Sequence, residues 1–552
     1  MHNSIKFLYK IFFSLRFYYV YYHKLKWLKS LDNISNKINS SNTNHKKKLK
    51  ILFGPSLAIQ QSSIALDRVV SAKLEHMGCE VVPMYCDAIQ DVECNVFGGD
   101  WVENKSFKEV CIKCEQYSQK MWKPYKNSLI KLSEFIDLKK RKREIEKSLD
   151  HLNLELLVNF TDDGINYGRL AKDILVNNKL VGSEKLVPKA NLLMKTHIKN
   201  LILLKESYTQ VIKQLRPDRV ISNDSYYGMW KVLEIICIKN SIPFYSQYPI
   251  TLDRMVIKQN GSAVDFNFKN NWQEFCKKPL TQFEEKQIDN WLEGKRGLFL
   301  DSTKSYKNSP RDSAVSRIDK GKPTIIIAAN VIWDLTALNK QIIFSDMINW
   351  ITETIEWFNS KNEFQLIIKP HPIEISKIIP NTNETVHSGI YSLFKTLPAN
   401  VHLLKPDTHI SSNEIIKTFD VRGVAVHTTT VGFESPIYGI PSITTAKSVY
   451  RELGFTIDPV NKSEYFEKIL YLLSGEKKIV DSSEILLAKK FLKFYRFHYF
   501  SKLNIFQGLP VEFAHDFENK ILNGDGPLDY ICKKIIDGKP INDHSSWLPY
   551  SP

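Results

Sequence analysis

The sequence of 552 residues lacks any run of about 18 uncharged apolar residues, the length that a membrane-crossing helix needs. This absence excludes a polytopic membrane protein. Cysteine is scarce: there are eight, and five of them lie between Cys79 and Cys114, which excludes a secreted scaffold held together by disulfides. Internal repeats and low-complexity tracts are also missing. The chain is therefore globular, and its length predicts two or more domains.

Acidic residues are nearly absent from one part of the chain. Residues 1–50 hold eleven Lys and Arg against one acid, Asp32, so this segment carries +10 of the formal net charge of +16. The rest of the chain is only mildly basic, and its run KKRKRE at 139–144 is expected to be a solvated helix face. Because the folded part shows no positive stripe, we expect no nucleic-acid partner.

Residues 4–31 interleave aromatic side chains with cations. Lys10 and Arg16 interrupt the apolar stretch, and no small-residue cleavage site follows it, so we expect neither a membrane span nor a secretory signal. Rings at headgroup level and cations on lipid phosphates suit a helix on an anionic membrane surface. The alternative is a terminal helix that packs its aromatic residues on the body. We expect residues 1–47 to be a membrane-surface extension whose end, 33–47, is a polar linker.

From residue 48 onward, short apolar runs alternate with longer helical segments, which is typical of parallel sheets covered by helices. The expected strands are 49–54, 80–85, 154–160, 218–223, 242–247, 323–330, 364–372, 401–405, 421–427 and 440–444. A polar linker over 301–322 separates the two groups of strands. The sequence therefore predicts an α/β protein with domains over 48–300 and 323–480, and a helical region over 481–552 that crosses back to the first domain.

Polar residues follow three expected strands of the second half, at the carboxyl ends where ligands bind in such sheets. The first group is Asn330–Asp334, which includes Trp333. The second is KPHP, residues 369–372, in which the prolines hold the backbone of His371 out of the helical region. Lys369 and His371 could together neutralise a phosphate. The alternative is a histidine that is satisfied within a rigid turn.

The third group lies where a strand ends and a helix is expected to begin, near Gly432. The hydroxyls of Thr428, Thr429 and Thr430, with the free backbone N–H groups of a helix start, would attract an anion. Glu434 lies one helical turn after Thr430, and a carboxylate there can accept both hydroxyls of a ribose. The alternative is a capped helix whose glutamate meets solvent.

In this order, NVIWD, KPHP and HTTTVGFES…YGIPSI, followed by Tyr450 and GFTIDP, resemble the motifs of glycosyltransferases that build capsules and other surface polysaccharides. The resemblance covers about residues 48–500, including the segment 222–249. It implies the GT-B fold, in which two Rossmann-like domains face a central cleft, with a nucleotide-sugar donor in the second domain and an acceptor in the first. By this resemblance, donor phosphate would be held by Lys369, His371 and the three threonines, ribose by Glu434, and the cleft would be lined by Asn330, Trp333 and Asp334.

Glycosyl transfer also needs a base for the acceptor hydroxyl. The expected strand 154–160 ends in the sequence TDDG, where two adjacent, partly buried carboxylates would raise each other's pKa. The group is similar to the acidic motif of bacterial sialyl- and polysialyltransferases, which implies that Asp162 is the base and Asp163 its support. The alternatives are an Asx turn that caps the next helix, and Asp224, after strand 218–223, as the second candidate base.

No DxD-type motif for a metal-bound diphosphate stands out, so we expect no metal and no cofactor. A zinc site built from Cys86, Cys94, Cys111 and Cys114 is chemically conceivable. Their spacing is irregular, however, and we expect ordinary reduced cysteines.

The sequence therefore predicts a bacterial glycosyltransferase of GT-B fold, peripheral on the cytoplasmic face of the inner membrane. It would move a sugar from a CMP- or UDP-linked donor to a growing surface polysaccharide or a lipid-linked glycan. Two alternatives stay open. A nucleotide-sugar epimerase of the same fold would convert its substrate with no acceptor present, and a non-catalytic scaffold of the polysaccharide assembly machinery would have no measurable nucleotide affinity.

Overall fold

The computed structural model describes residues 26–541 except 42–48, 57–60, 91–106, 227, 252–253, 267–268, 299–312, 335–337, 376–381, 409, 476–479, 509–511 and 525. The chain forms two compact units, which are described separately below. The first consists of the described parts of 1–178, 189–266 and 499–552, and the second of 179–188 and 267–498. Within these ranges, no helix combines the length and the apolarity that crossing a bilayer requires.

The first unit is built on a seven-stranded sheet with the order β14-β8-β7-β6-β1-β2-β3. Its strands are β1 (Lys50–Phe53), β2 (Glu80–Tyr85), β3 (Ile130–Lys131), β6 (Arg219–Asn223), β7 (Phe244–Thr251), β8 (Arg254–Gln259) and β14 (Ser501–Lys502). Five neighbouring strands, β3, β2, β1, β6 and β7, pair in parallel. The strands β8 and β14 join at the β7 side through antiparallel pairs. In chain order the parallel strands run 3-2-1-4-5, the Rossmann order, which reverses between β1 and β6.

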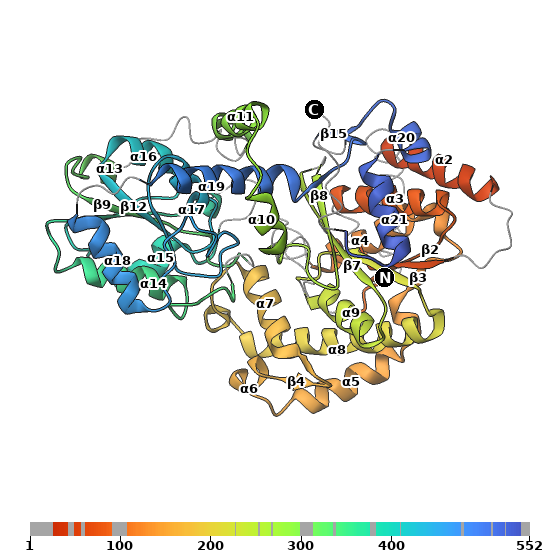
Figure 1. The fold of residues 1–552 in the computed structure, drawn as a ribbon. Helices are drawn as coiled ribbons and strands as arrows, with labels where there is room; N and C mark the ends of the chain where they lie inside the picture. Colours follow the sequence, from red (N-terminus) through yellow and green to blue (C-terminus); the bar gives the residue numbers. More distant parts are fainter. Residues whose placement is uncertain are drawn as a thin grey trace. The chain divides into compact units, whose positions relative to one another are not determined.

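Helices cover both faces of this sheet (Figure 1). One face carries α2 (Lys26–Ser41), α3 (Gln61–His76), α20 (Phe517–Asn523) and α21 (Pro527–Asp537), which share a continuous apolar core with β1, β6 and β7. The other helices of this part of the chain are α4 (Phe107–Met121), α5 (Leu138–Leu149), α6 (Leu154–Val158), α7 (Tyr167–Lys179), α8 (Ala190–Leu215) and α9 (Gly228–Lys239). Residues 517–537, far along the chain, thus complete the core of the first unit.

The helix α2 corrects the expected linker over 33–47. Its apolar side chains recur at helical spacing, and Trp27, Leu31 and Ile34 are buried in the core of the first unit. The ring of Trp27 also stacks on that of Phe513, with centroids 5.9 Å apart. Residues 26–41 are therefore part of the fold, whereas residues 1–25, which hold most of the expected membrane-surface segment, lie outside the described residues.

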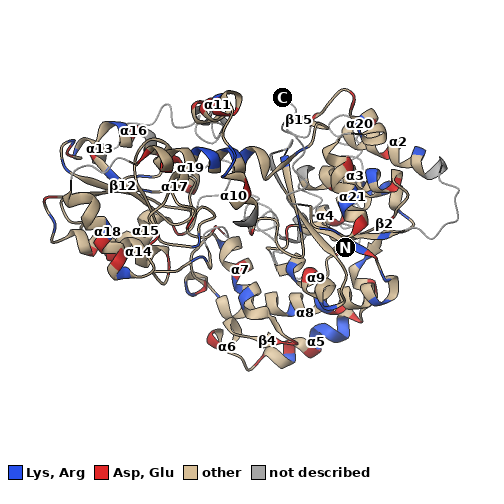
Figure 2. Ribbon diagram, in the orientation of Figure 1, with Lys and Arg blue, Asp and Glu red and all other residues tan. Residues whose placement is uncertain are grey.

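The cationic run at 139–144 lies on α5, which is coloured largely blue in Figure 2. Part of its charge is neutralised within the unit. The guanidinium of Arg141 forms ion pairs with Glu144 and with Glu206 of α8 (2.6 Å to the latter), and Glu146 of α5 pairs with Lys199 at 2.5 Å. This arrangement agrees with a helix that turns its remaining charges to solvent.

The second unit has a five-stranded sheet in which all pairs are parallel, with the order β11-β10-β9-β12-β13. Its strands are β9 (Thr324–Ala328), β10 (Gln365–Lys369), β11 (Val401–Leu403), β12 (Val421–Val426) and β13 (Ser442–Thr444). In chain order they again run 3-2-1-4-5, and the order reverses between β9 and β12. The fold class is thus α/β with two Rossmann-like units, as the expected GT-B class requires.

The helices of the second unit are α10 (Lys269–Phe275), α11 (Gln282–Leu298), α13 (Ser313–Ser316), α14 (Met347–Phe358), α15 (Val386–Tyr391), α16 (Ser412–Thr418), α17 (Val431–Ile437), α18 (Lys462–Ser474) and α19 (Ser482–Lys493). One apolar core joins the sheet to α14, α15 and α18 (Figure 1). The sequence assigned α10 and α11 to the first domain, but they belong to the second unit. The physical reason is that Trp272 of α10 packs edge-on against Phe491 of α19, at 5.6 Å between ring centroids.

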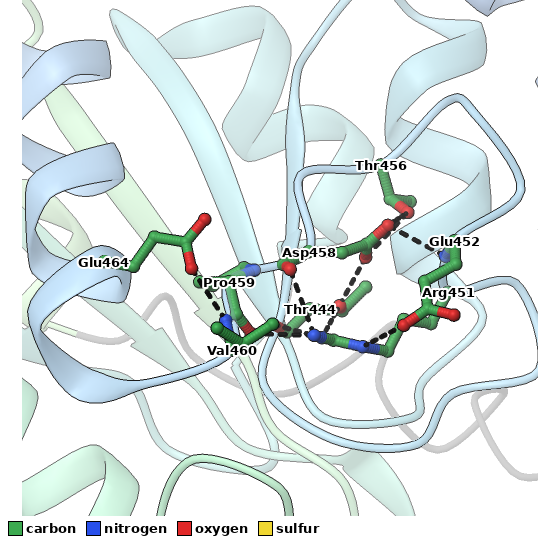
Figure 3. A network of polar contacts seen from close by, with 8 residues as sticks. All are labelled: Thr444, Arg451, Glu452, Thr456, Asp458, Pro459, Val460 and Glu464. Carbon is green, nitrogen blue, oxygen red and sulfur yellow. Dashed lines mark hydrogen bonds and ion pairs between the residues drawn. The ribbon is translucent and has the colours of Figure 1, made fainter.

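After β13 the chain is held by a network of hydrogen bonds around Arg451 and Asp458 (Figure 3). The guanidinium of Arg451 donates to the Thr444 hydroxyl (2.6 Å) and to the carbonyls of Asp458 and Pro459 (3.0 and 2.7 Å). The carboxylate of Asp458 accepts from the hydroxyls of Thr444 and Thr456 at 2.6 and 2.9 Å. Because these polar groups satisfy one another, the GFTIDP motif supports the edge of the sheet at β13.

Candidate functional site

The register of the second sheet brings the three expected groups of polar residues to one edge. Ala328, the last residue of β9, is the direct neighbour of Lys369 at the end of β10 on one side and of Val426 at the end of β12 on the other. The residues that follow these strands therefore emerge side by side at the carboxyl edge. Asn330 follows β9 and Thr428 follows β12, and the Asn330 Oδ1 accepts a 3.0 Å hydrogen bond from the Thr428 N–H. This bond spans the point where the strand order reverses, which is where ligands bind in such sheets.

Lys369 ends β10, and its side chain is mostly buried, with the residue only 8% exposed. Burial lowers the pKa of its ammonium to about 8, and the negative charge of Glu414 acts in the opposite direction. Among the described residues, no carboxylate forms an ion pair with this ammonium. A buried charge that forms no ion pair is unfavourable for stability, and an anionic ligand at this edge would supply a direct partner.

His371 lies two residues beyond the end of β10 and is half-buried. Its Nδ1 accepts a 3.2 Å hydrogen bond from the N–H of Ile373. In the neutral ring the proton is therefore on Nε2, which can donate to a phosphate oxygen. The turn is further held by the N–H of Glu374, which donates to the His371 carbonyl at 3.1 Å. The rigid KPHP turn expected from the sequence is present, and the role of His371 stays a prediction.

The threonine segment follows β12 and leads into α17, with Thr430 at the N-cap position. Thr428 Oγ1 is buried and has no hydrogen-bond partner among the described residues. The Thr429 carbonyl accepts a 2.6 Å hydrogen bond from the Tyr450 hydroxyl, which fixes the backbone of the turn. Gly432 is required here, because a Cβ at this position would lie 2.2 Å from the same hydroxyl oxygen. An unpaired buried hydroxyl beside Asn330 leaves one polar group for a ligand to satisfy.

The other predicted donor-site residues are less open than the sequence suggested. Glu434 is buried on α17, which disagrees with the alternative of a glutamate that meets solvent. The indole N–H of Trp333 donates to the Thr382 hydroxyl at 3.1 Å, and the residue is buried. Asp334 is half-buried, and its carbonyl accepts the N–H of Leu338 at 2.9 Å. The contacts of Trp333 and Asp334 hold the loop after β9, and ligand binding by these residues stays a prediction.

Sequence reasoning missed Glu374, which is fully buried three residues after His371. Its Oε1 accepts the N–H of Val386 at 3.0 Å, while its Oε2 is buried with no partner among the described residues. Burial raises its pKa to about 8, and the nearby charge of Glu384 acts in the same direction. The acid is therefore mostly protonated at neutral pH. The only sequence signal was its position two residues after KPHP.

Glu374→Gln is expected to flatten the pH dependence of stability. The folded-state pKa of about 8 lies above the usual 4.5, so the folded protein holds a proton that the unfolded chain releases. The stability that this proton contributes is complete below the pKa of the unfolded chain. It is lost as the pH rises through the pKa of the folded protein, by up to about 1.4 kcal/mol per pH unit. Urea unfolding of both proteins between pH 5 and pH 9 should show that the stability of the variant relative to that of the wild type increases with pH. Parallel curves would contradict the assignment.

The structure corrects the expected surroundings of Asp162 and Asp163. Residues 154–158 form α6 instead of a strand. TDDG forms the first strand and the turn of a small hairpin, in which β4 (Thr161–Asp162) pairs with β5 (Ile165–Asn166). Both aspartates are exposed rather than partly buried. Lys205 at 3.1 Å and Lys239 at 3.4 Å lower the pKa of Asp163 through hydrogen bonds and charge. The physical argument for a base with raised pKa at this position is therefore wrong.

The location of the hairpin is also not the one expected. Lys239 ends α9, the helix that starts after the carboxyl end of β6 and returns toward the start of β7. Asp163, which pairs with Lys239, thus lies toward the amino-terminal side of the parallel strands. Ligands in such sheets bind at the opposite edge. Asp224, directly after β6, is the candidate that the structure places at the carboxyl edge.

None of the described cysteines forms a disulfide, and within the described residues no group of three or more His, Cys, Asp or Glu is arranged to hold a metal ion. Cys111 and Cys114 lie on α4, and Cys86 follows β2. Cys94 lies outside the described residues. Both the zinc alternative and the expectation of reduced cysteines therefore stay predictions.

No family model matches the chain, and no curated protein matches it. Solved structures that resemble it include two Kdo transferases of Thermosulfurimonas dismutans KpsC. The β-Kdo 2,7 transferase is 14% identical with a TM-score of 0.29, over 58% of this chain and 89% of its own. The β-Kdo 2,4 transferase is 11% identical with a TM-score of 0.32, over 55% of this chain and 87% of its own. The Methanocaldococcus jannaschii UDP-GlcNAc 2-epimerase, solved with UDP-GlcNAc and UDP, is 12% identical with a TM-score of 0.25, over 81% of this chain and 99% of its own. All three TM-scores are low, so the fold class rests on the strand orders of the two sheets.

Proposed function

We propose that the protein is a glycosyltransferase whose second unit binds a nucleotide-sugar donor at the carboxyl edge of its sheet. The observation that carries this proposal is Lys369, a buried ammonium at that edge with no carboxylate partner among the described residues. The diphosphate or monophosphate of a nucleotide is the anion that we expect there. Asn330, which follows the neighbouring strand β9, and Thr428, which follows β12, meet across the strand-order reversal at the same edge of the sheet. The order of the three motifs along the chain supports sugar transfer as the reaction.

Each residue of the edge then has a chemical task. Lys369 neutralises the phosphate that departs with the nucleotide, and the Nε2–H of His371 donates to one of its oxygens, so both stabilise charge that grows in the transition state. Thr428 Oγ1 and the turn through Thr429 and Thr430 complete the phosphate site, and Glu434 accepts the ribose hydroxyls. The acceptor is a growing surface polysaccharide or a lipid-linked glycan, which the protein meets at an anionic membrane surface through the basic, aromatic segment that precedes α2, residues 4–25.

The first test is a thermal-shift panel of CMP, CDP, UDP, GDP and their sugar conjugates on the full chain. A ligand at about 100 Kd adds roughly 2.7 kcal/mol to the stability of the state that binds it. We expect one nucleotide and its sugar conjugates to raise the melting temperature of the wild type, and His371→Ala to reduce that shift. Transfer should be lost in both His371→Ala and Glu434→Ala while the proteins stay folded.

His387→Ala is the matched control, because His387 is also half-buried in the second unit but lies on α15, which holds none of the proposed donor-site residues. It should keep the full shift. A protein that no nucleotide stabilises would contradict the proposal and favour the scaffold. Conversion of the bound nucleotide sugar in the absence of any acceptor would favour the epimerase.

A further inference from the structure

Residues 179–188 belong to the second unit, although the chain before and after them belongs to the first. This inserted segment begins at Lys179, the last residue of α7. Leu180 and Val181, which follow, are buried, with 3% and 6% of their surface exposed. The proposed donor site does not use the inserted segment, yet the segment packs directly against the loop after β9.

Three hydrogen bonds hold the inserted segment to another part of the second unit. The N–H of Gly182 donates to Glu384 Oε2 at 2.7 Å, and the Glu384 N–H donates to the Leu180 carbonyl at 3.1 Å. The side-chain amide of Asn383 donates to the Lys179 carbonyl at 2.8 Å. Leu180 has a φ of 54°, in the left-handed region that residues with a Cβ seldom adopt. Such a backbone conformation persists only where surrounding contacts hold it, so these bonds fix the segment in one geometry.

Gly182 also lies against Ile332, in the middle of the loop after β9. A Cβ at Gly182 would lie 2.2 Å from Ile332 Cγ2, which is far too close for two carbon atoms. That methyl group is attached to the branched Cβ of a buried side chain, so it cannot swing away as the tip of a long side chain can. Only glycine therefore lets the inserted segment approach this loop so closely.

The same part of the second unit also reaches the turn after β10. The indole N–H of Trp333 donates to the Thr382 hydroxyl at 3.1 Å, and the Thr382 N–H donates to the Glu374 carbonyl at 3.1 Å. The Glu374 N–H in turn donates to the His371 carbonyl at 3.1 Å. Residues 382–384 thus connect the inserted segment to the loop after β9 and to the turn that holds His371.

We propose that the inserted segment positions the loop after β9 for nucleotide binding, with Gly182 and Glu384 as its positioning residues. The effect on binding rests on the proposed function, in which the nucleotide lies at the edge beside this loop. Asn330 lies two residues before Ile332, and its Oδ1 accepts the N–H of Thr428 at 3.0 Å. A displacement of Ile332 would therefore loosen the bond that joins the ends of β9 and β12 at the proposed phosphate site.

Gly182→Ala in the full chain is the test variant. Hydrogen exchange is followed in a peptide that covers residues 329–334, which includes the Asp334 N–H that donates to the Val331 carbonyl at 3.3 Å. Affinity is measured by isothermal titration with the nucleotide that the thermal-shift panel identifies. Because the added methyl group displaces Ile332, we expect faster exchange in this peptide. Nucleotide affinity should fall about 10- to 100-fold, as for loss of one hydrogen bond to a charged group.

Two further variants separate positioning from a general loss of stability. The double variant Gly182→Ala with Ile332→Ala should recover most of the affinity, because the clashing methyl group is gone, whereas two independent losses would add. Glu384→Ala removes the acceptor of the Gly182 N–H without crowding the contact. It should also speed exchange and weaken binding, and it keeps the inference testable if Gly182→Ala does not fold.

Gly423→Ala is the matched control. A Cβ at Gly423 would lie 2.8 Å from Leu472 Cδ1, but this atom is the tip of a flexible side chain and can move aside. Gly423 lies within β12, three residues before its end, and holds no part of the loop after β9. This variant should leave both the exchange of the peptide and the nucleotide affinity unchanged.

Wild-type exchange in both Gly182→Ala and Glu384→Ala overturns the inference. Faster exchange with intact nucleotide affinity also overturns it, because the inserted segment would then have a structural role only. Equal losses of affinity in Gly182→Ala and in the double variant would contradict displacement of Ile332 as the cause. A wild type that no nucleotide stabilises would instead reject the proposed function, and the exchange rates would still show whether the inserted segment holds the loop.

Discussion

Lys369→Met is expected to weaken nucleotide binding by roughly 10- to 100-fold and, at the same time, to make the free protein more stable. The first effect follows because a hydrogen bond to a charged group contributes about 1.5–3 kcal/mol and each 1.4 kcal/mol is about tenfold in affinity. The second follows from the burial that lowers the pKa of Lys369 to about 8. Methionine has a similar length and carries no charge that burial disfavours.

The sign of the pH dependence makes this prediction sharper. The folded-state pKa of Lys369 lies below the usual 10.5, so between about pH 8 and pH 10.5 the unfolded chain holds a proton that the folded protein has released. Wild-type stability should gain from this group as the pH rises through that range, and Lys369→Met should lose the gain. Nucleotide affinity of the wild type should fall above about pH 8, because the free ammonium loses its charge there.

Isothermal titration with the nucleotide identified in the panel and urea unfolding measure the two effects. Lys417→Met is the control, because Lys417 is exposed on α16 of the same unit. It should change neither affinity nor stability noticeably. If Lys369→Met destabilises the protein and leaves affinity intact, Lys369 has a structural role and the donor site lies elsewhere.

The strands of the second unit were predictable because each is a short, almost unbroken apolar run. The runs TIIIA, QLIIK and VRGVAV are typical of parallel strands that are buried on both faces. Their carboxyl ends therefore placed Asn330, Lys369 and Thr428 correctly at one edge. What the sequence could not show is that Lys369 forms no ion pair among the described residues, since acids reach such a position from distant parts of the chain.

The helix α6 shows why the first half was harder. The run LELLVNF has the length and composition of a strand, and periodicity alone does not separate such a run from a short helix. Asn153 decides the outcome, since its side chain accepts the N–H of Leu156 at 3.0 Å and caps the first turn. An asparagine directly before the run was therefore the available signal. Once 154–158 is helical, the aspartates after it fall into an exposed hairpin.

The helix α2 was also readable in part. Trp27, Leu31, Ile34 and Ile38 follow a helical period, but the polar residues between them resemble a linker in composition. Its partner could not be found from the sequence, because Asp32 meets Arg68 across 36 positions of the chain. Buried ion pairs of this kind depend on tertiary packing alone.

Asp32→Ala is expected to lower the free energy of unfolding of the first unit by about 3–5 kcal/mol, because it leaves a buried guanidinium without its counter-charge. Arg68 is fully buried, donates to Asp32 Oδ1 at 2.8 Å and to the Met121 carbonyl, and lies over the rings of Trp122 and Tyr125 at 5.8 and 5.6 Å from their centroids. Urea unfolding of the full chain, followed by tryptophan fluorescence, measures the loss.

The double variant Asp32→Ala with Arg68→Met separates the ion pair from the packing of α2. Removing both charges should recover part of the loss, because no buried charge is then left unpaired. Glu80→Gln is the exposed comparison: Glu80 pairs with Lys50 at 3.9 Å near the surface of the same unit and should contribute at most about 1 kcal/mol. A loss for Asp32→Ala no larger than that for Glu80→Gln would mean that α2 does not belong to the folded core. Residues 26–41 would then be the linker that their composition suggested, because only a docked helix keeps Asp32 beside Arg68.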